Sequence, residues 1–128
     1  MNLKGCFLHS TTDVRTPLDL FNALEDEFGD LYDPCPLGGT LGLLEEWKSP
    51  SYVNPPYGKE TRAFVEKAIM EHKTGKTIIL LLPVRTDLSW FHDLILPNAS
   101  EIRFIRGRLR FEGYKSGAPF PSMLVIFK

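Results

Sequence analysis

The segment TIILLLP, residues 77–83, restricts the fold of this chain more than any other stretch of its sequence. Its core, Ile78 to Leu82, is apolar without interruption, whereas a strand with one face in water alternates apolar and polar side chains. The run is also far too short to cross a bilayer, which takes about 20 apolar residues. Such a strand must be covered on both faces, which is typical of a sheet with helices packed on either side.

Helical and strand-like patterns alternate along the rest of the chain. Between Thr16 and Phe28, apolar residues recur at helical spacing. Thr16 is the predicted N-cap of this helix and Pro17 its first residue, while Gly29 stands where a helix commonly ends in a left-handed conformation. The remaining predicted elements are helices at 59–73 and 88–96, and strands at 31–33, 51–53, 77–83, 101–105, 107–113 and 122–128.

This order of elements predicts a single α/β domain over residues 1–128, with residues 1–12 as a candidate flexible N-terminal segment. The sheet is expected to be mostly parallel, with an antiparallel C-terminal hairpin formed by the last two strands and with helices on both faces. In open α/β sheets, ligands bind beyond the carboxyl ends of the strands. The segments DPCP and NPPYG both follow predicted strand ends, and we therefore expect them to lie side by side.

The stretch NPPYG, residues 54–58, must turn away from a buried strand, because a proline pair cannot continue a hydrogen-bonded ladder. A polar turn of this kind is suited to holding a planar amine, such as the amino group of adenine, while it is methylated. That amino group is a poor nucleophile, and a catalyst must accept hydrogen bonds from both of its N–H groups. The Asn54 side-chain oxygen and the Pro55 carbonyl, directed by Pro56, can accept them while Tyr57 stacks on the base. The same chemistry suits RNA adenine, guanine amines or a glutamine amide, and a plain tight turn would use the same residues.

The stretch YDPCPLGG suggests a second site. A strand that ends in an acidic residue, here Asp33, and leads into a glycine-containing turn is the usual way to receive a nucleoside cofactor. In this chain prolines replace the early glycines of that pattern. A surface loop without a ligand is the alternative that this stretch leaves open.

The charge distribution is compatible with an anionic partner for the C-terminal half, and ordinary variation in surface charge is the alternative. Residues 1–57 carry three basic and nine acidic side chains, whereas residues 58–128 carry twelve and seven. Arg106, Arg108 and Arg110 stand at alternate positions, which would place them on one face of a strand as candidate phosphate contacts. A solvated strand face is the alternative. Arg85 follows the most buried strand and is a further candidate for contact with an anionic partner.

Cysteine and histidine content argues against several other classes of protein. Two cysteines make no disulfide framework, and with only three histidines a metal site is not expected. The N-terminal sequence MNLKGCFLHS lacks the apolar region of a signal peptide. The expected location is therefore the cytoplasm, which for a phage-encoded protein is the cytoplasm of the host.

Six blocks of sequence, taken in order, are more specific than the NPPY motif alone: RTPLDLFNALEDEFG, DPCP, YVNPPYG, LLLPVRTDLSWFHD, FIRGRLRF and SMLVIF. Together, from about Thr16 to Phe127, they resemble the phage-type DNA N6-adenine methyltransferase family. The resemblance implies a compact Rossmann-like methyltransferase sheet, with DNA as partner and S-adenosyl-L-methionine as cofactor. It also implies that the target adenine is flipped into a pocket at NPPY and methylated at N6. The residues implied are Asn54, Pro55, Pro56 and Tyr57 for the base, and Thr16, Pro17, Asp33, Pro34 and Cys35 for the cofactor.

The interval between the two motifs is short for a methyltransferase. Asp33 and Asn54 are 21 positions apart, whereas one βαβ unit needs about 30 residues. The strands usually found between the cofactor motif and NPPY are therefore expected to be missing. Their role then passes to Glu45, Glu46 or Trp47, or the cofactor half is vestigial, and a homodimer is a candidate way to complete the site.

Two other functions remain open at this stage. The chain could bind nucleic acid or a protein partner without catalysis, as a truncated methyltransferase-like module. It could also methylate RNA or a protein amide instead of DNA.

Overall fold

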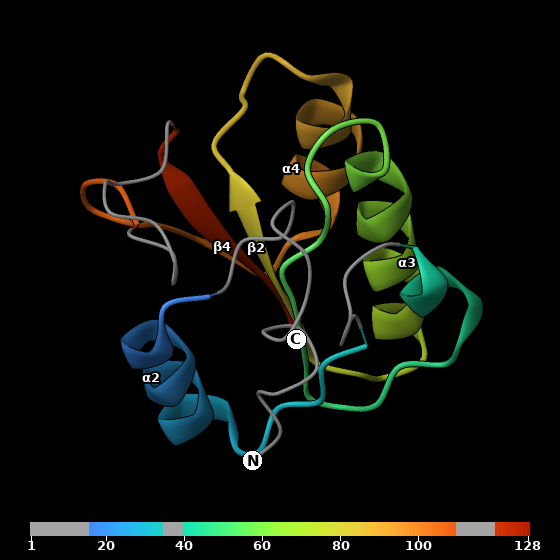
Figure 1. Ribbon diagram of the computed structural model, residues 1–128. Coiled ribbons are helices and arrows are strands. Elements are labelled where there is room, and N and C mark those ends of the chain that lie inside the picture. Colours follow the sequence, from blue (N-terminus) through green and yellow to red (C-terminus); the bar gives the residue numbers. More distant parts are fainter. Residues whose placement is uncertain (1–15, 35–39, 110–119) are drawn as a thin grey trace.

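The computed structural model describes residues 16–34, 40–109 and 120–128. Figure 1 shows how their helices flank a central sheet. The elements are α2 (Leu18–Phe28), the 3₁₀ turn η1 (Leu41–Leu44), β1 (Ser51–Val53), α3 (Thr61–Lys73), β2 (Ile78–Pro83), the π-helical segment η2 (Phe91–Ile95), α4 (Leu96–Asn98), β3 (Glu101–Phe104) and β4 (Ser122–Phe127).

The strands of the described chain form one sheet of four, in the order β1-β2-β4-β3. β1 and β2 are parallel, with Ser51 opposite Ile78. β4 is antiparallel to both of its neighbours and brings Ser122 opposite Pro83 of β2. As a result β1, β2 and β3 point the same way, and β4 runs between β2 and β3 in the opposite direction.

This topology confirms the α/β class but not a mostly parallel sheet. Within the described ranges, only the β1-β2 pairing and an isolated bridge between Tyr32 and Ser51 are parallel. Both pairings of β4 are antiparallel. The order could not be read from the sequence, because β2 and β4 both consist almost entirely of apolar residues and both are inner strands of the sheet.

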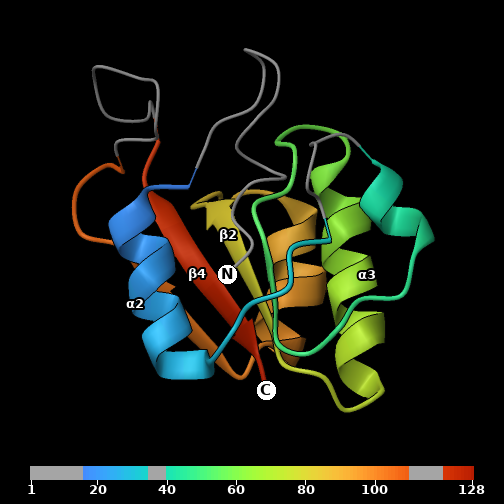
Figure 2. The same cartoon turned by 60° about the horizontal axis from the view of Figure 1, so that its bottom comes forward.

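Helices cover both faces of the sheet, as expected. α2 lies over one face, and α3 and α4 lie over the other (Figure 2). On the α2 side, Phe21 and Leu24 pack with Ile79 and Leu81 of β2. The alternate residues of β2 point toward α3, because successive side chains of a strand face opposite sides.

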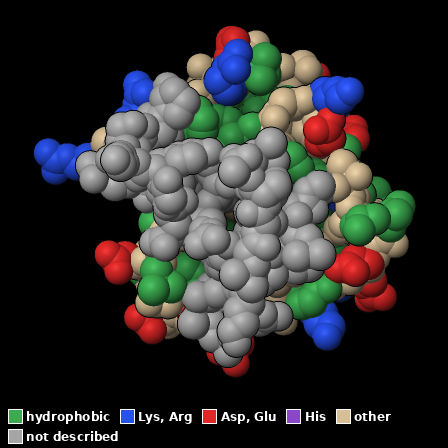
Figure 3. Space-filling model, in the orientation of Figure 1, with side chains coloured by type: hydrophobic (Ala, Val, Ile, Leu, Met, Phe, Trp, Pro, Cys, Tyr) green, Lys and Arg blue, Asp and Glu red, His purple; other side chains and the backbone are tan. Residues whose placement is uncertain are grey.

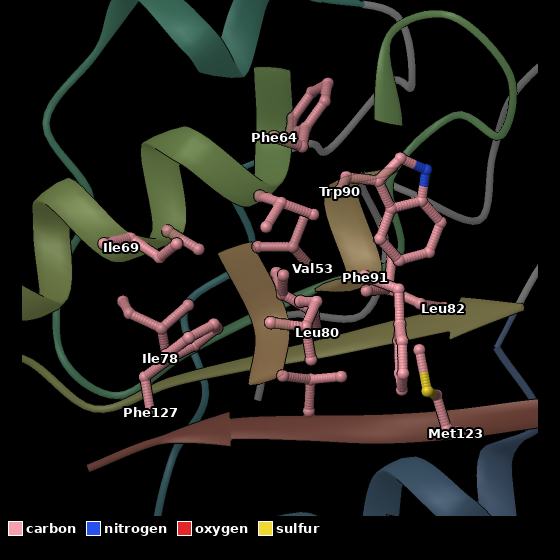
Figure 4. Close-up of a cluster of buried hydrophobic side chains, with 14 of the residues drawn as sticks. Val53, Phe64, Ile69, Ile78, Leu80, Leu82, Trp90, Phe91, Met123 and Phe127 are labelled. Atoms are coloured by element: carbon pink, nitrogen blue, oxygen red, sulfur yellow. The ribbon is translucent and has the colours of Figure 1, made fainter. Parts of the chain in front are cut away.

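The larger core fills the space between the sheet and α3. Figure 4 shows Leu80 and Leu82 of β2 among Phe64, Phe91 and Met123. Leu80, Phe64 and Met123 have no exposed surface at all. β2 is therefore buried on both faces, which confirms the prediction from its uninterrupted apolar sequence.

The first helix begins one residue later than predicted, at Leu18 rather than at Pro17. Thr16 does not cap it, because the Thr16 hydroxyl lies 2.7 Å from the Tyr52 hydroxyl of β1, in a buried hydrogen bond between α2 and the sheet. Pro17 takes the cap position and has no side chain that could bond the helix N–H groups. The helix ends as predicted, with Gly29 at φ 93°.

The buried bond between Thr16 and Tyr52 should contribute to stability. Replacing Tyr52 with phenylalanine removes its hydroxyl and leaves the Thr16 hydroxyl without this bond, which should cost about 1 kcal/mol in the free energy of unfolding. Urea unfolding of Tyr52→Phe, Thr16→Val and the double variant measures the coupling. Costs that simply add in the double variant would mean that the two hydroxyls do not stabilise each other.

The prediction of a strand at 107–113 is wrong for residues 107–109, which are the part of it that the structure describes, because residues 105–109 form no strand. Gly107 has φ 73°, a left-handed conformation that breaks an extended run. The antiparallel partner of β4 is instead β3, which lies within the separate strand predicted at 101–105. Residues 110–113, like the N-terminal segment 1–12, lie outside the described residues.

A charged cluster ties the end of α3 to the following loop. The Glu71 carboxylate is 2.8 Å from the Lys67 ammonium and 2.5 Å from that of Lys76, and Glu71 is only 8% exposed. Burial by itself would raise the pKa of Glu71, but hydrogen bonds from the two lysines hold it below its ordinary value of 4.5. The carboxylate is thus more acidic in the folded chain than in the unfolded one.

This shift gives a pH-dependent stability. The contribution of Glu71 is complete above its unfolded pKa and is lost as the pH falls through the lower folded pKa. Glu71→Gln should therefore cost about 2 kcal/mol at pH 7, and the difference from the native chain should shrink below about pH 4.5. Urea unfolding at several pH values measures it. A difference that stays constant from pH 7 to pH 3 would contradict this assignment.

Candidate functional site

One edge of the sheet collects most of the residues predicted for the site. The strand register places the carboxyl ends of β1, β2 and β3 at this edge, together with the start of β4. Two backbone hydrogen bonds extend the strand pairing at this edge. The Val84 N–H donates to the Pro121 carbonyl over 2.9 Å, and the Ile105 N–H donates to the Ser122 carbonyl over 3.0 Å. Asn54 follows β1 directly and so leaves the sheet at the same edge.

Asn54 and Tyr57 meet at the end of β1. The Tyr57 hydroxyl donates to Asn54 Oδ1 over 3.0 Å and lies 3.4 Å from the Leu81 carbonyl of β2. The Tyr57 ring packs edge-on against Phe120, with ring centres 5.3 Å apart. Burial raises the pKa of the Tyr57 hydroxyl, which therefore keeps its proton and stays a donor. The tyrosine as a whole is half-buried.

The turn after Tyr57 is closed by Thr61, the first residue of α3. Gly58 has φ 123°, a backbone conformation that residues other than glycine rarely adopt. Its N–H donates to Thr61 Oγ1 over 3.0 Å. Thr61 Oγ1 in turn donates to the Pro56 carbonyl over 3.0 Å. Sequence reasoning did not single out Thr61, because a threonine beside a helix N-terminus is too common to mark a site.

The residues predicted for the cofactor approach the same edge from two directions. Thr16 is bonded to Tyr52, two positions before Asn54, and this bond holds the start of α2 against β1. Asp33 and Pro34 follow Tyr32, whose parallel bridge to β1 directs them toward the carboxyl edge. Cys35 lies outside the described residues.

The three residues that could replace the missing strands have different surroundings. Trp47 is a core residue, 1% exposed, whose indole N–H donates to the Gly42 carbonyl. Glu46 forms an ion pair with Lys76 at 3.1 Å. Glu45 instead accepts a 2.7 Å bond from the Tyr32 hydroxyl, and this bond, with burial and nearby carboxylates, raises the pKa of Tyr32 to about 12.

The candidate DNA contacts differ in their surroundings. Arg85 donates two hydrogen bonds, each of 3.1 Å, to the Asp87 carboxylate, so its charge is already paired. Arg106 and Arg108 are exposed beyond the end of β3, but not on one face of a strand as predicted, because no strand forms there. Figure 3 shows Lys and Arg side chains along the upper and left margins of the face displayed. Arg110 lies outside the described residues.

The described residues hold no group of three or more His, Cys, Asp or Glu side chains that could bind a metal ion. None of their helices has the length and apolar character that crossing a membrane requires.

Together, fold and edge define a small α/β protein with a polar, proline-rich loop at the carboxyl end of its sheet. The family model described as DNA N-6-adenine-methyltransferase (Dam) matches residues 40–128. The chain therefore belongs to the Dam family of DNA N-6-adenine methyltransferases, as the resemblance in its sequence indicated. The match includes the Asn54–Tyr57 loop and begins after Asp33. No curated protein and no solved structure matches the chain.

Proposed function

We propose that this chain transfers a methyl group from S-adenosyl-L-methionine to the N6 amino group of adenine in DNA. Family membership supports the reaction class. The observation that carries the proposal is the hydrogen bond between Tyr57 and Asn54 Oδ1 at the carboxyl end of β1. It presents an oriented carboxamide oxygen and an aromatic ring together, which are the two groups that capture of an adenine requires.

The carboxamide of Asn54 acts as a fixed acceptor. Its oxygen has two lone-pair directions, and the Tyr57 hydroxyl takes one of them. The other accepts an N–H of adenine N6, and the Pro55 carbonyl accepts the second N–H. Positive charge develops on N6 as the methyl group arrives and is stabilised by two oriented oxygens, and the proton that N6 then loses passes to solvent, so that no side-chain general base is needed. The Tyr57 ring holds the plane of the extruded base.

The residues at the edge fit a nucleoside cofactor. S-adenosyl-L-methionine, when bound, supplies an electrophilic methyl group. Asp33 follows Tyr32, whose isolated bridge to Ser51 lies beside β1, and an acidic side chain after a strand of such a sheet commonly receives a ribose. Glu45, held by the Tyr32 hydroxyl, offers a second carboxylate nearby. With these we place Thr16, Pro17, Pro34 and Cys35 around the cofactor.

Exposed cations would bind the DNA backbone. Arg106 and Arg108 lie beyond the end of β3, at the same edge as Asn54, and phosphate contacts there would hold the duplex beside the loop. We assign Arg110 and Arg85 to the same interface. Arg85 would have to leave its ion pair with Asp87 in order to bind a phosphate.

A noncatalytic binding module is the second candidate, and one observation favours it. Residues 40–50 contain only the turn η1, so this part of the interval adds no strand to the cofactor half of the sheet. Titration calorimetry with S-adenosyl-L-methionine, in the presence and absence of DNA, separates the two candidates. Cofactor binding supports the enzyme, whereas DNA binding without any cofactor heat supports the module.

The acceptor is tested separately. The chain is incubated with S-adenosyl-L-methionine and unmethylated DNA, RNA or protein, and the products are analysed by mass spectrometry. N6-methyladenine in DNA alone supports the proposal, and a methylated RNA or protein amide would replace DNA as acceptor. A homodimer and a cytoplasmic location stay predictions.

A further inference from the structure

Thr61 is a buried polar residue that the proposed reaction does not itself use. The residue is 2% exposed, yet both hydrogen bonds that its hydroxyl makes go to the loop rather than to its own helix. It accepts from the Gly58 N–H and donates to the Pro56 carbonyl, each over 3.0 Å. These two peptide groups stand immediately before and after Tyr57. One hydroxyl therefore clamps the backbone on both sides of the tyrosine.

The opposite end of the tyrosine is also anchored. The Tyr57 hydroxyl donates to Asn54 Oδ1 and lies close to the Leu81 carbonyl of β2. The side chain is thus held at its backbone by Thr61 and at its tip by Asn54 and the sheet. A shift of the backbone at Tyr57 would move the ring. It would also turn the Asn54 carboxamide, because the Tyr57 hydroxyl donates a hydrogen bond to it.

We propose that Thr61 is a positioning residue for methyl transfer, fixing the Tyr57 ring and the Asn54 carboxamide in the geometry that the target adenine requires. This inference rests on the proposed function. Thr61 acts through the loop and does not touch the base. A displacement of about 1 Å at a reacting group can cost about 100-fold in rate, so a hydroxyl outside the site can control turnover.

Two substitutions separate the hydroxyl from the shape of the side chain. Thr61→Val keeps the branched shape but loses both bonds to the loop, whereas Thr61→Ser keeps the hydroxyl. We expect Thr61→Val to lower kcat by about 10- to 100-fold, with KM for DNA and for S-adenosyl-L-methionine changed less than about threefold. Thr61→Ser should recover most of kcat.

A matched control lies at the other end of α3. The Thr74 hydroxyl donates to the Glu71 carbonyl over 2.7 Å, far from the loop in sequence. Thr74→Val should leave kcat unchanged. A residue that only stabilised the fold would lower the melting temperature without changing kcat per folded molecule, so thermal unfolding is followed for every variant.

Amide hydrogen exchange reports on the clamp without any substrate. In the native chain the Gly58 N–H should be protected, and Thr61→Val should lose that protection while the N–H groups of β2 keep theirs. Native kcat in Thr61→Val, or equal loss in Thr61→Ser and Thr61→Val, would overturn the inference and leave the proposed function intact. Absence of methyl transfer by the native chain to any acceptor would instead overturn the proposed function and the role of Thr61 with it.

Discussion

Replacing Asn54 with alanine should lower methyl transfer by at least about 100-fold while leaving the fold intact. The variant loses the Oδ1 that accepts one N–H of the target amine, and removal of one preoriented group at developing charge costs about 100- to 1,000-fold in kcat. Asn54 is half-buried and follows β1 rather than forming part of it, so its loss should cost only about 1 kcal/mol in the free energy of unfolding, for the hydrogen bond that the Tyr57 hydroxyl loses. Turnover with labelled S-adenosyl-L-methionine measures the effect.

Asn98 offers the matched control for this substitution. Its side-chain amide donates to the Leu94 carbonyl at the end of α4, which leads into β3 at the opposite end of that strand from the site. Asn98→Ala should keep native turnover. If Asn54→Ala methylated DNA at the native rate, the assignment of Asn54 as the amine acceptor would be wrong.

The largest effect on stability is expected at Leu80. This side chain lies in the middle of β2, has no exposed surface and packs in the core between the sheet and α3. Leu80→Ala should lower the free energy of unfolding by about 3 to 5 kcal/mol, because a close-packed core collapses only partly around the cavity. Since a domain of this size has about 5 to 15 kcal/mol in total, the variant should lose a large fraction of its stability.

Leu44 is the matched control, because it is 83% exposed in the turn η1. Leu44→Ala should change the free energy of unfolding by less than about 0.5 kcal/mol. Urea denaturation followed by Trp fluorescence compares the two variants. Equal, small effects at Leu80 and Leu44 would show that β2 is not the central buried strand.

The elements that were predicted correctly are each determined by residues within the element itself or next to it. The uninterrupted apolar run of β2 requires burial on both faces, and Gly29 ends α2 because glycine adopts positive φ without strain. The predictions that failed depended on distant partners. The Thr16 hydroxyl bonds Tyr52 across the fold instead of capping α2, and nothing within the Thr16 segment reveals that choice.

The candidate site shows the same division. The meeting of Asn54 and Tyr57 at the end of β1 follows from a strand, two prolines and a glycine, all adjacent in sequence. The prediction that Arg106 and Arg108 share one face of a strand failed, because Gly107 takes a left-handed conformation between them and breaks the alternation on which the prediction relied. The role of Thr61 depends on the three-dimensional closure of the loop, which spacing does not encode.

The most direct test of the methyltransferase assignment is incorporation of tritiated methyl groups from S-adenosyl-L-methionine into unmethylated DNA, with Asn54→Ala run alongside. The Dam family membership and the paired Asn54 and Tyr57 predict label in DNA, recovered as N6-methyladenine, from the native chain and at least about 100-fold less from the variant. Unlabelled adenine in DNA exposed to a folded native chain that binds the cofactor would contradict it.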